Sequence, residues 1–178
     1  MNDDLLETLR DAQRFGFFGA APIEQAAAHS TAFIDAIGDL DVAARLVDLG
    51  SGGGLPGLVL ADRYPTVSIT LIDRREKRTD FLRRAVRRLG FDHVEVLAGD
   101  VDELIRAVES GVSPRFDVVT ARGFGPPEPT LRRAVRLIGS SGRIVISEPP
   151  EGDRWDPALL VELGLTRHRS GVVSVFHA

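Results

Sequence analysis

The sequence of 178 residues contains no cysteine, four histidines and one residue each of methionine, tryptophan and tyrosine. Without cysteine the chain cannot form disulfides, thiolate metal sites or a cysteine nucleophile. The histidines are scattered along the chain and lack the spacing of metal ligands; they are His29, His93, His168 and His177. We therefore expect no metal site.

Long apolar runs are also missing. No stretch approaches the roughly 18 apolar residues of a membrane-spanning helix, and the acidic start Met1-Asn2-Asp3-Asp4 differs from the basic start of a signal peptide. We expect a cytoplasmic protein without membrane contact. The composition, with 43% hydrophobic and 27% charged residues, is that of a globular protein, and the length fits about one domain. A formal net charge of −4 leaves nucleic-acid binding only to a local patch.

From about residue 43 the sequence alternates short β-branched runs with segments of helical periodicity, which is typical of βαβ units. The expected strands are 45–49, 67–72, 93–98, 116–121 and 142–147, and the expected helices are 56–63, 75–89, 100–109 and 129–138. The pattern predicts an α/β fold with a doubly wound, Rossmann-like sheet. A helix at 156–163 and two runs separated by Ser170-Gly171, 165–169 and 172–177, predict a terminal antiparallel hairpin.

Two further helical segments, 3–14 and 23–37, precede the first strand. They are joined by the segment Phe15-Gly16-Phe17-Phe18-Gly19, and Pro22 suits the start of the second helix. The expected organisation is an N-terminal helical cap over 1–40 and a ligand-binding domain over 41–178. The cap either packs on the sheet or closes over a ligand, and the sequence leaves both possibilities open.

The most informative segment follows the first expected strand, where ligands bind in open α/β sheets. It reads Asp48-Leu49-Gly50-Ser51-Gly52-Gly53-Gly54-Leu55-Pro56-Gly57. Glycines allow tight turns and a close approach of the backbone to a ligand. Gly52-x-Gly54-x-x-Gly57 fits a dinucleotide pattern, whereas Asp48-x-Gly50-x-Gly52-x-Gly54 fits an S-adenosylmethionine pattern. The second interpretation also accounts for Asp48 and Ser51, with Asp48 facing the cationic amino group of the methionine moiety, and it is favoured.

Acidic residues end the next two expected strands. Asp73 is placed to accept both ribose hydroxyls of a nucleotide, although an aspartate also commonly ends a strand. Asp100 could bond the exocyclic amine of adenine while Leu97 and Val101 flank the ring, but Asp100 is equally suited to cap the helix that follows.

These segments resemble the RsmG (GidB) family of class I methyltransferases, which methylate a guanine N7 of small-subunit ribosomal RNA. The resemblance covers about residues 45–146 and rests on VDLGSGGGLPGLVLA at 47–61, LID at 71–73 with Lys77-Arg78 and Phe81-Leu82, and FDVVTAR at 116–122. It implies a seven-stranded sheet ending in an antiparallel hairpin. It also implies cofactor contacts at Gly50, Leu55, Asp73, Val101, Asp102 and Arg122.

The sequence departs from the family pattern at several positions. Asp100-Val101-Asp102 stands where the family usually has Arg-Ala-Glu, and Arg122-Gly123 where it has Arg-Ala. After the fifth strand the family's Lys-Gly is replaced by Ser147-Glu148-Pro149-Pro150, interpreted as a loop whose Glu148 would repel phosphate. The N-terminal Asn-Leu-Thr motif is missing, with His29 as a loose counterpart. The resemblance is to a shortened, divergent branch.

A basic run at 74–88 holds eight of the 22 basic residues. A solvated helix face and an RNA-binding stripe are both consistent with such a run. Its cations are Arg74, Arg75, Lys77, Arg78, Arg83, Arg84, Arg87 and Arg88.

The resulting expectation is an S-adenosylmethionine-dependent methyltransferase, acting on guanine N7 of 16S ribosomal RNA through the basic run. Guanine N7 has a free lone pair, so no general base is needed, and the sequence shows no obvious His/Asp or Ser/His pair. Arg122 is the candidate for positioning the acceptor. The alternatives are methylation of a small molecule or protein, and a non-catalytic module that binds cofactor or RNA.

Overall fold

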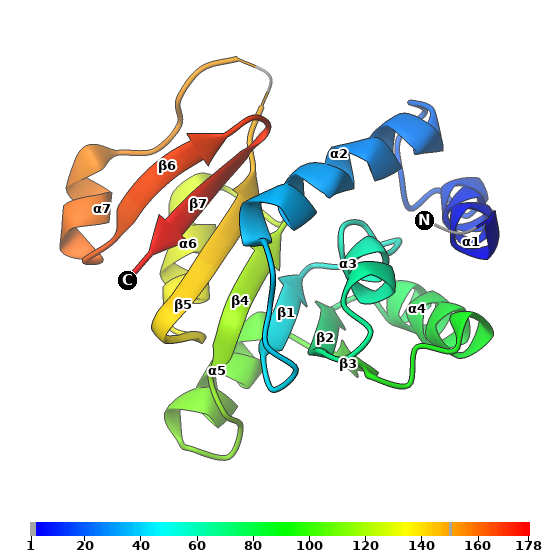
Figure 1. The fold of residues 1–178 in the computed structure, drawn as a ribbon, viewed down its shortest axis with the longest axis horizontal. Helices are drawn as coiled ribbons and strands as arrows, with labels where there is room; N and C mark the ends of the chain where they lie inside the picture. The colour runs from blue at the N-terminus through cyan, green and yellow to red at the C-terminus, as the bar shows by residue number, and fades with distance from the viewer. Residues whose placement is uncertain (1–2, 150) are drawn as a thin grey trace.

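The computed structural model describes residues 3–149 and 151–178 (Figure 1). In this part of the chain seven strands form one sheet in the order β3-β2-β1-β4-β5-β7-β6. Strands β1 to β5 are parallel, and β7 is antiparallel to both of its neighbours. The strands are β1 (Arg45–Leu49), β2 (Ser68–Asp73), β3 (Val94–Ala98), β4 (Phe116–Ala121), β5 (Ile138–Ser147), β6 (Thr166–Ser170) and β7 (Val173–His177).

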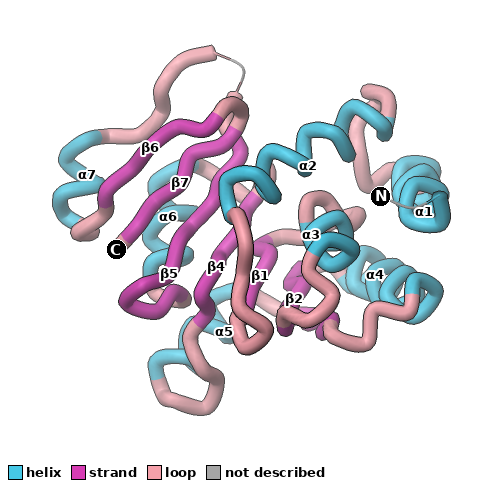
Figure 2. Tube along the Cα trace, in the orientation of Figure 1, coloured by secondary structure: helices cyan, strands magenta, loops and turns pink. Residues whose placement is uncertain are grey.

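Helices cover both faces of the sheet (Figure 2). One face, with Leu46, Ile69 and Val118, packs against α1 to α4, and the other, with Val47 and Ile144, packs against α5 to α7. The strands alternate between these two cores because successive side chains point to opposite faces. The helices are α1 (Asp3–Arg14), α2 (Ile23–Ile37), α3 (Gly57–Arg63), α4 (Glu76–Leu89), α5 (Val101–Glu109), α6 (Pro127–Val135) and α7 (Pro157–Glu162).

All the expected helices and strands are present, but the boundary between the sixth helix and the fifth strand was predicted too late in the chain. The helix expected at 129–138 is α6, which begins at Pro127, and the strand expected to begin at 142 begins at Ile138. Proline fits the first turn of a helix because its missing N–H has no partner there in any case. Pro127 therefore begins the helix two residues before its expected start, and the chain reaches β5 earlier than expected.

The terminal hairpin is confirmed, and its position in the sheet explains the strand order. Its turn lies at Gly171-Val172, one residue beyond the expected Ser170-Gly171. Strand β7 lies between β5 and β6, with Val175 opposite both Val145 and His168. Because β7 inserts antiparallel to β5, the turn of the hairpin lies at the carboxyl edge of the parallel strands.

The first two helices are part of the main hydrophobic core. Leu5 and Leu9 of α1 and Phe33 of α2 are fully buried in the same cluster as residues of α3, β1 and β2. Packing on the sheet is therefore observed, whereas the division into a cap over 1–40 and a domain over 41–178 stays a prediction. Across the described residues, no helix is long and apolar enough to cross a membrane. Met1, Asn2 and Pro150, used in the sequence expectations, lie outside the described residues.

Candidate functional site

The glycine-rich loop begins where β1 ends and occupies the carboxyl edge of the sheet. Gly50 and Gly52 have φ angles of +66° and +56°, in the left-handed region that favours glycine. The loop is tied to the neighbouring strand by the Ser51 N–H, which donates to the Ile72 carbonyl at 3.0 Å. The sequence prediction of a tight backbone turn at this place is confirmed.

Asp73 holds this loop in place from the end of β2. Its Oδ2 accepts a hydrogen bond from the Gly52 N–H at 3.0 Å, and its Oδ1 accepts one from the Arg75 N–H at 2.9 Å. The Arg78 guanidinium lies 3.4 Å from Oδ2. The side chain is buried, so these charge-assisted contacts are well shielded from water. Asp73 is therefore a structural anchor of the loop as well as a candidate ribose ligand.

A cleft of about 340 Å³ opens beside Asp73. Among the predicted cofactor residues it is lined by Gly50, Asp73, Asp100 and Val101. The sequence analysis missed the rest of its wall, since these side chains come from separate parts of the chain. The missed residues are Ile72, Arg74, Arg75, Arg78, Gly99, Gly123, Phe124, Gly125, Pro126, Pro129, Thr130 and Arg133.

The capping role considered for Asp100 is observed, whereas its contact with adenine stays a prediction. Asp100 lines the cleft, and its side chain accepts a hydrogen bond from the Asp102 N–H at 2.9 Å, which caps α5. Asp102 is not among the residues that line the cleft and pairs with Arg133, which does line it, at 2.9 and 3.2 Å. Hydrogen bonds from Arg133 lower the pKa of Asp102. The structure therefore places Val101 at the cleft and Asp102 in an ion pair beside it.

Four other predicted residues lie within or beneath the loop, away from the cleft lining. Ser51 donates its hydroxyl to the Asp48 carbonyl at 2.8 Å, and Leu55 is buried in the core. A side chain at Gly54 would clash with Leu58, whereas one at Gly52 would only touch Arg78 at 3.6 Å. A substitution at Gly52 would therefore act through its positive φ rather than by filling the cleft.

Asp48 is fully buried beneath the loop. Its Oδ1 accepts a hydrogen bond from the Thr120 hydroxyl at 2.7 Å, while its Oδ2 has no hydrogen-bond partner among the described residues. Burial raises the pKa of Asp48 to about 6, against the opposing effects of the Thr120 hydrogen bond and the positive charge of Arg122. The structure therefore does not bring Asp48 to the cleft lining, and its contact with a cationic amino group stays a prediction.

Arg122 and His29 lie near Asp48 at the same edge of the sheet. Arg122 is partly buried and has no hydrogen bond or ion pair with the residues that the structure describes. Burial lowers its pKa, and the charge of Asp48 raises it. Burial and then the charge of Arg122 lower the pKa of His29, whose buried Nε2 has no partner in the described part of the chain. A backbone hydrogen bond with Val172 opposes this shift in His29, and neither Arg122 nor His29 lines the cleft.

Thr130 supplies a further free group, this time in the cleft itself. It is 2% exposed, and its Oγ1 has no hydrogen-bond partner among the described residues. A buried hydroxyl without a partner costs free energy, so a ligand that bonds to it recovers that loss. Nothing in the local sequence marked this threonine, because it lies inside an ordinary helical segment.

Aromatic rings lie on the glycine loop from two sides. A Cβ at Gly50 would come within 2.7 Å of the Phe124 ring, and a Cβ at Gly53 within 2.6 Å of the Phe18 ring. Phe18 belongs to the segment between α1 and α2, so this segment reaches the loop. The glycines are required here for close ring packing as well as for backbone conformation.

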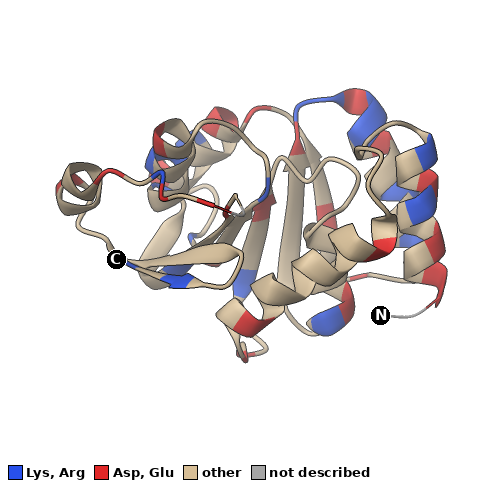
Figure 3. Ribbon diagram, turned by 90° about the horizontal axis from the view of Figure 1, so that it is seen from above, with Lys and Arg blue, Asp and Glu red and all other residues tan. Residues whose placement is uncertain are grey.

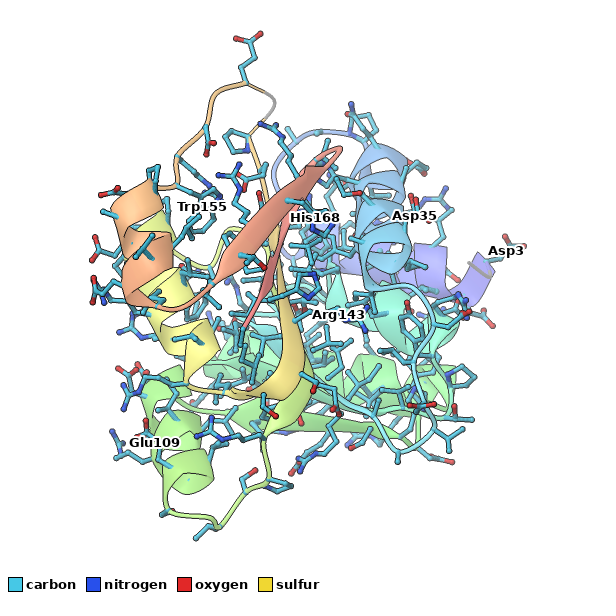
Figure 4. The ribbon with its side chains drawn as sticks, turned by 60° about the vertical axis from the view of Figure 1, so that its left-hand side comes forward. Asp3, Asp35, Glu109, Arg143, Trp155 and His168 are labelled. Carbon is cyan, nitrogen blue, oxygen red and sulfur yellow. The ribbon has the colours of Figure 1, made fainter. Side chains whose placement is uncertain are left out.

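The expectation that Glu148 repels phosphate is wrong. Its carboxylate is almost fully buried and accepts hydrogen bonds from Arg154 Nε at 3.0 Å and from Trp155 Nε1. Trp155, labelled in Figure 4, packs edge-on against Phe176 of β7, with the ring centroids 4.7 Å apart. The negative charge is neutralised inside the loop after β5, where it supports the structure.

The basic run forms the exposed side of α4 and the turn before it, seen as a blue band at the right of Figure 3. Three of its eight cations are paired: Arg78 with Asp73, Arg83 with Asp80, and Arg88 with Glu7 and Asp11. The other five are exposed, and their side chains have no ion pair within the described residues; they are Arg74, Arg75, Lys77, Arg84 and Arg87.

Comparison with known protein families identifies the family to which this chain belongs. The family model GidB, described as rRNA small subunit methyltransferase G, matches residues 26–148. The chain belongs to the GidB family. A ribosomal RNA small subunit methyltransferase G from Neisseria gonorrhoeae is 44% identical over 103 residues, which are 58% of this chain and 46% of that protein. One from Ralstonia nicotianae is 37% identical over 103 residues, covering 58% and 44%.

The chain spans about half the length of the curated GidB relatives it matches. Its fold is that of class I methyltransferases. The O-methyltransferase from Bacillus cereus, solved in complex with SAH, superposes with a TM-score of 0.66 at 13% identity and covers 99% of this chain and 90% of that one. The expected fold class and the resemblance to the RsmG family are thus confirmed.

Proposed function

We propose that this GidB chain is an S-adenosylmethionine-dependent methyltransferase whose acceptor is guanine N7 in small-subunit ribosomal RNA. The observation that carries the proposal is the anchoring of the glycine loop by Asp73 beside an open cleft. This places a carboxylate at the end of β2, where nucleotide ribose is bound in folds of this type. The family membership and the names of the relatives support methylation of small-subunit ribosomal RNA.

The residues of the cleft fit this cofactor. The Thr130 hydroxyl lines the cleft and is a buried polar group without a partner among the described residues, as expected where a polar ligand completes the hydrogen bonding. We assign the ribose to Asp73, the adenine to Asp100 and Val101, and the methionine moiety to the Gly50 end of the loop near Arg122. Ser51, Gly52, Gly54, Leu55 and Asp102 support these contacts from behind.

When bound, S-adenosylmethionine supplies an activated methyl group. The protein's contribution is to hold the acceptor nitrogen in line with it, and such alignment lowers a barrier by up to several kcal/mol. Guanine N7 is nucleophilic in the neutral base, so no side chain has to remove a proton. Arg122 follows β4 at the carboxyl edge and is assigned to orient the acceptor base.

The five unpaired cations are assigned to the RNA backbone. We choose three of them that lie outside the cleft lining, Lys77, Arg84 and Arg87, for a test. A control of equal charge change is Arg106, Arg132 and Arg136 on α5 and α6, of which Arg132 and Arg136 are already paired with carboxylates.

The experiment incubates the protein and labelled S-adenosylmethionine with ribosomal RNA, naked and as assembled subunits, from a strain that lacks the protein. We expect incorporation at guanine N7 that falls strongly in the Lys77, Arg84, Arg87→Gln variant but not in the control. RNA affinity in the variant should also depend less on salt, by up to about 2 log units per log unit of salt if three phosphate contacts are lost. Cofactor binding without incorporation into any RNA would favour the small-molecule or protein acceptor.

A further inference from the structure

Phe15 stands out on the surface because this large apolar residue is 64% exposed. It follows α1 and lies against the side of α4. Its ring centroid is 6.0 Å from both the Phe17 and the Phe81 rings, and Phe17 is 5.6 Å from Phe81. Phe81 is buried in the core. The exposed side chain of Phe15 is thus supported by two further aromatic rings.

Cations surround this ring. Two surface depressions border Phe15: one is lined with Phe17, Lys77, Asp80 and Arg84, and the other with Gly16, Phe17, Arg75, Glu76, Lys77 and Arg78. We call Phe15, Phe17, Arg75, Lys77 and Arg84 the aromatic–basic patch. Arg75, Lys77 and Arg84 have no ion pair within the described residues. Of the nearby acids, Asp80 is neutralised by Arg83 at 3.2 Å, so only Glu76 opposes them.

The patch is continuous with the cofactor cleft. Arg75 and Arg78 line both the cleft and the depression beside Phe15. A chain molecule held on the patch would therefore pass the mouth of the cleft.

We propose that Phe15 is a stacking platform for an unpaired RNA base, with Arg75, Lys77 and Arg84 holding the adjoining phosphates. The proposal rests on the proposed function and specifies the form of RNA that this surface takes. Aromatic rings flanked by cations are the usual means of binding single-stranded RNA, since every base has a face that can stack. A duplex keeps its bases stacked internally and offers Phe15 only backbone.

The distribution of exposed apolar residues favours RNA over a lipid surface. The other large exposed apolar side chains in the described part of the chain are Val42, Val112 and Val161. They belong to the loop before β1, the turn after α5 and helix α7. A membrane surface would require several apolar side chains around Phe15, whereas a single base requires one ring.

The test measures binding of the full chain to a short unstructured RNA and to an RNA duplex. Phe15→Ala should weaken binding to the unstructured RNA by roughly tenfold, as expected for one lost stacking contact, and should leave duplex binding unchanged. Its salt dependence should stay that of the wild type because no phosphate contact is lost. Val161→Ala, a truncation of an exposed residue far along the chain, is the control and should bind like the wild type.

Phe15→Trp provides a fluorescence signal that RNA would not quench if residue 15 had only a structural role. We expect it to bind as tightly as the wild type and its new tryptophan fluorescence to be quenched by the unstructured RNA. The single native tryptophan, Trp155, is buried. Unchanged RNA affinity in Phe15→Ala, or no quenching in Phe15→Trp, would overturn the proposal. Loss of binding to phosphatidylserine vesicles in Phe15→Ala with RNA binding intact would overturn it in favour of a membrane surface.

The experiments distinguish a failure of the stacking proposal from a failure of the proposed methyltransferase function. Binding of unstructured RNA that depends on Phe15, in a protein that transfers no methyl group to RNA, would support the platform and refute the RNA methyltransferase. Methylation of ribosomal RNA at unchanged KM in Phe15→Ala would support the methyltransferase and refute the platform.

Discussion

The two walls of the cleft differ in how completely their polar groups are bonded. On the glycine-loop wall both oxygens of Asp73 accept hydrogen bonds from the backbone and one also faces Arg78. On the opposite wall the Thr130 hydroxyl has no partner among the described residues. The first wall is thus held in shape by the protein's own hydrogen bonds, and we expect the second to be completed by a ligand. This difference predicts that mutations in the first wall damage fold and binding together, whereas mutations in the second separate them.

The largest effect is expected from Asp73→Ala. It removes the acceptor of two backbone N–H groups and the partner of Arg78, so we expect the free energy of unfolding to fall by about 3 kcal/mol and cofactor affinity by roughly a hundredfold. Asp73→Asn keeps one acceptor and should be intermediate. Urea unfolding and calorimetry with S-adenosylhomocysteine measure the two effects.

Asp117→Ala is the matched control, because Asp117 Oδ2 accepts a hydrogen bond from the Arg45 N–H at the other end of the strands. It should lower stability and leave affinity unchanged. If Asp73→Ala binds within twofold of the wild type, the ribose assignment is wrong and the two walls do not differ as argued.

Asp48, beneath the first wall, should make stability depend on pH. Its pKa is about 6 in the folded protein against 3.8 as the ordinary value, so the folded state holds the proton more tightly than the unfolded chain. The stabilisation is complete below pH 3.8 and is lost as the pH rises through 6. Asp48→Asn has no such titration, and its stability relative to the wild type should therefore rise by about 2.4 kcal/mol between pH 4 and 7.

Urea unfolding of both proteins across that range measures the difference, and parallel curves would contradict the argument. If ionised Asp48 also faces the cationic end of the cofactor, affinity in the wild type should increase as the pH rises through about 6. In Asp48→Asn this increase should disappear.

Thr130→Val tests the second wall with the smallest expected change. The substitution removes a buried hydroxyl that has no partner, so the ligand-free protein should become more stable by about 1 kcal/mol. Cofactor affinity should fall by roughly tenfold because the bond to the ligand is lost. Thermal melting with and without S-adenosylhomocysteine detects both changes.

Thr79→Val is the comparison variant. The buried Thr79 hydroxyl already donates to the Glu76 carbonyl at 3.0 Å, so its loss should lower stability without affecting affinity. Equal affinity of Thr130→Val and the wild type would show that the hydroxyl does not contact the cofactor.

The two walls also differ in how well their residues could be predicted from the sequence. The glycine loop and Asp73 were predictable because the loop is continuous in sequence and Asp73 directly ends a strand. Thr130 and the segment 123–129 were not, since their position depends on how α6 packs beside the ends of β1 and β4. Glu148 shows the converse error: its charge is evident in the sequence, but the partners that bury it, Arg154 and Trp155, become neighbours only through the fold of their loop.

The insertion of β7 between β5 and β6 has a consequence for synthesis on the ribosome. Every earlier strand can pair with a neighbour that has already emerged, but β5 and β6 are joined only by residues 173–177. Until these residues emerge, β5 presents an unpaired edge with Ile144, Val145 and Ile146, which is a hazard for aggregation. The exposed edge of β5 is therefore covered only once residues 173–177 have emerged and paired with it.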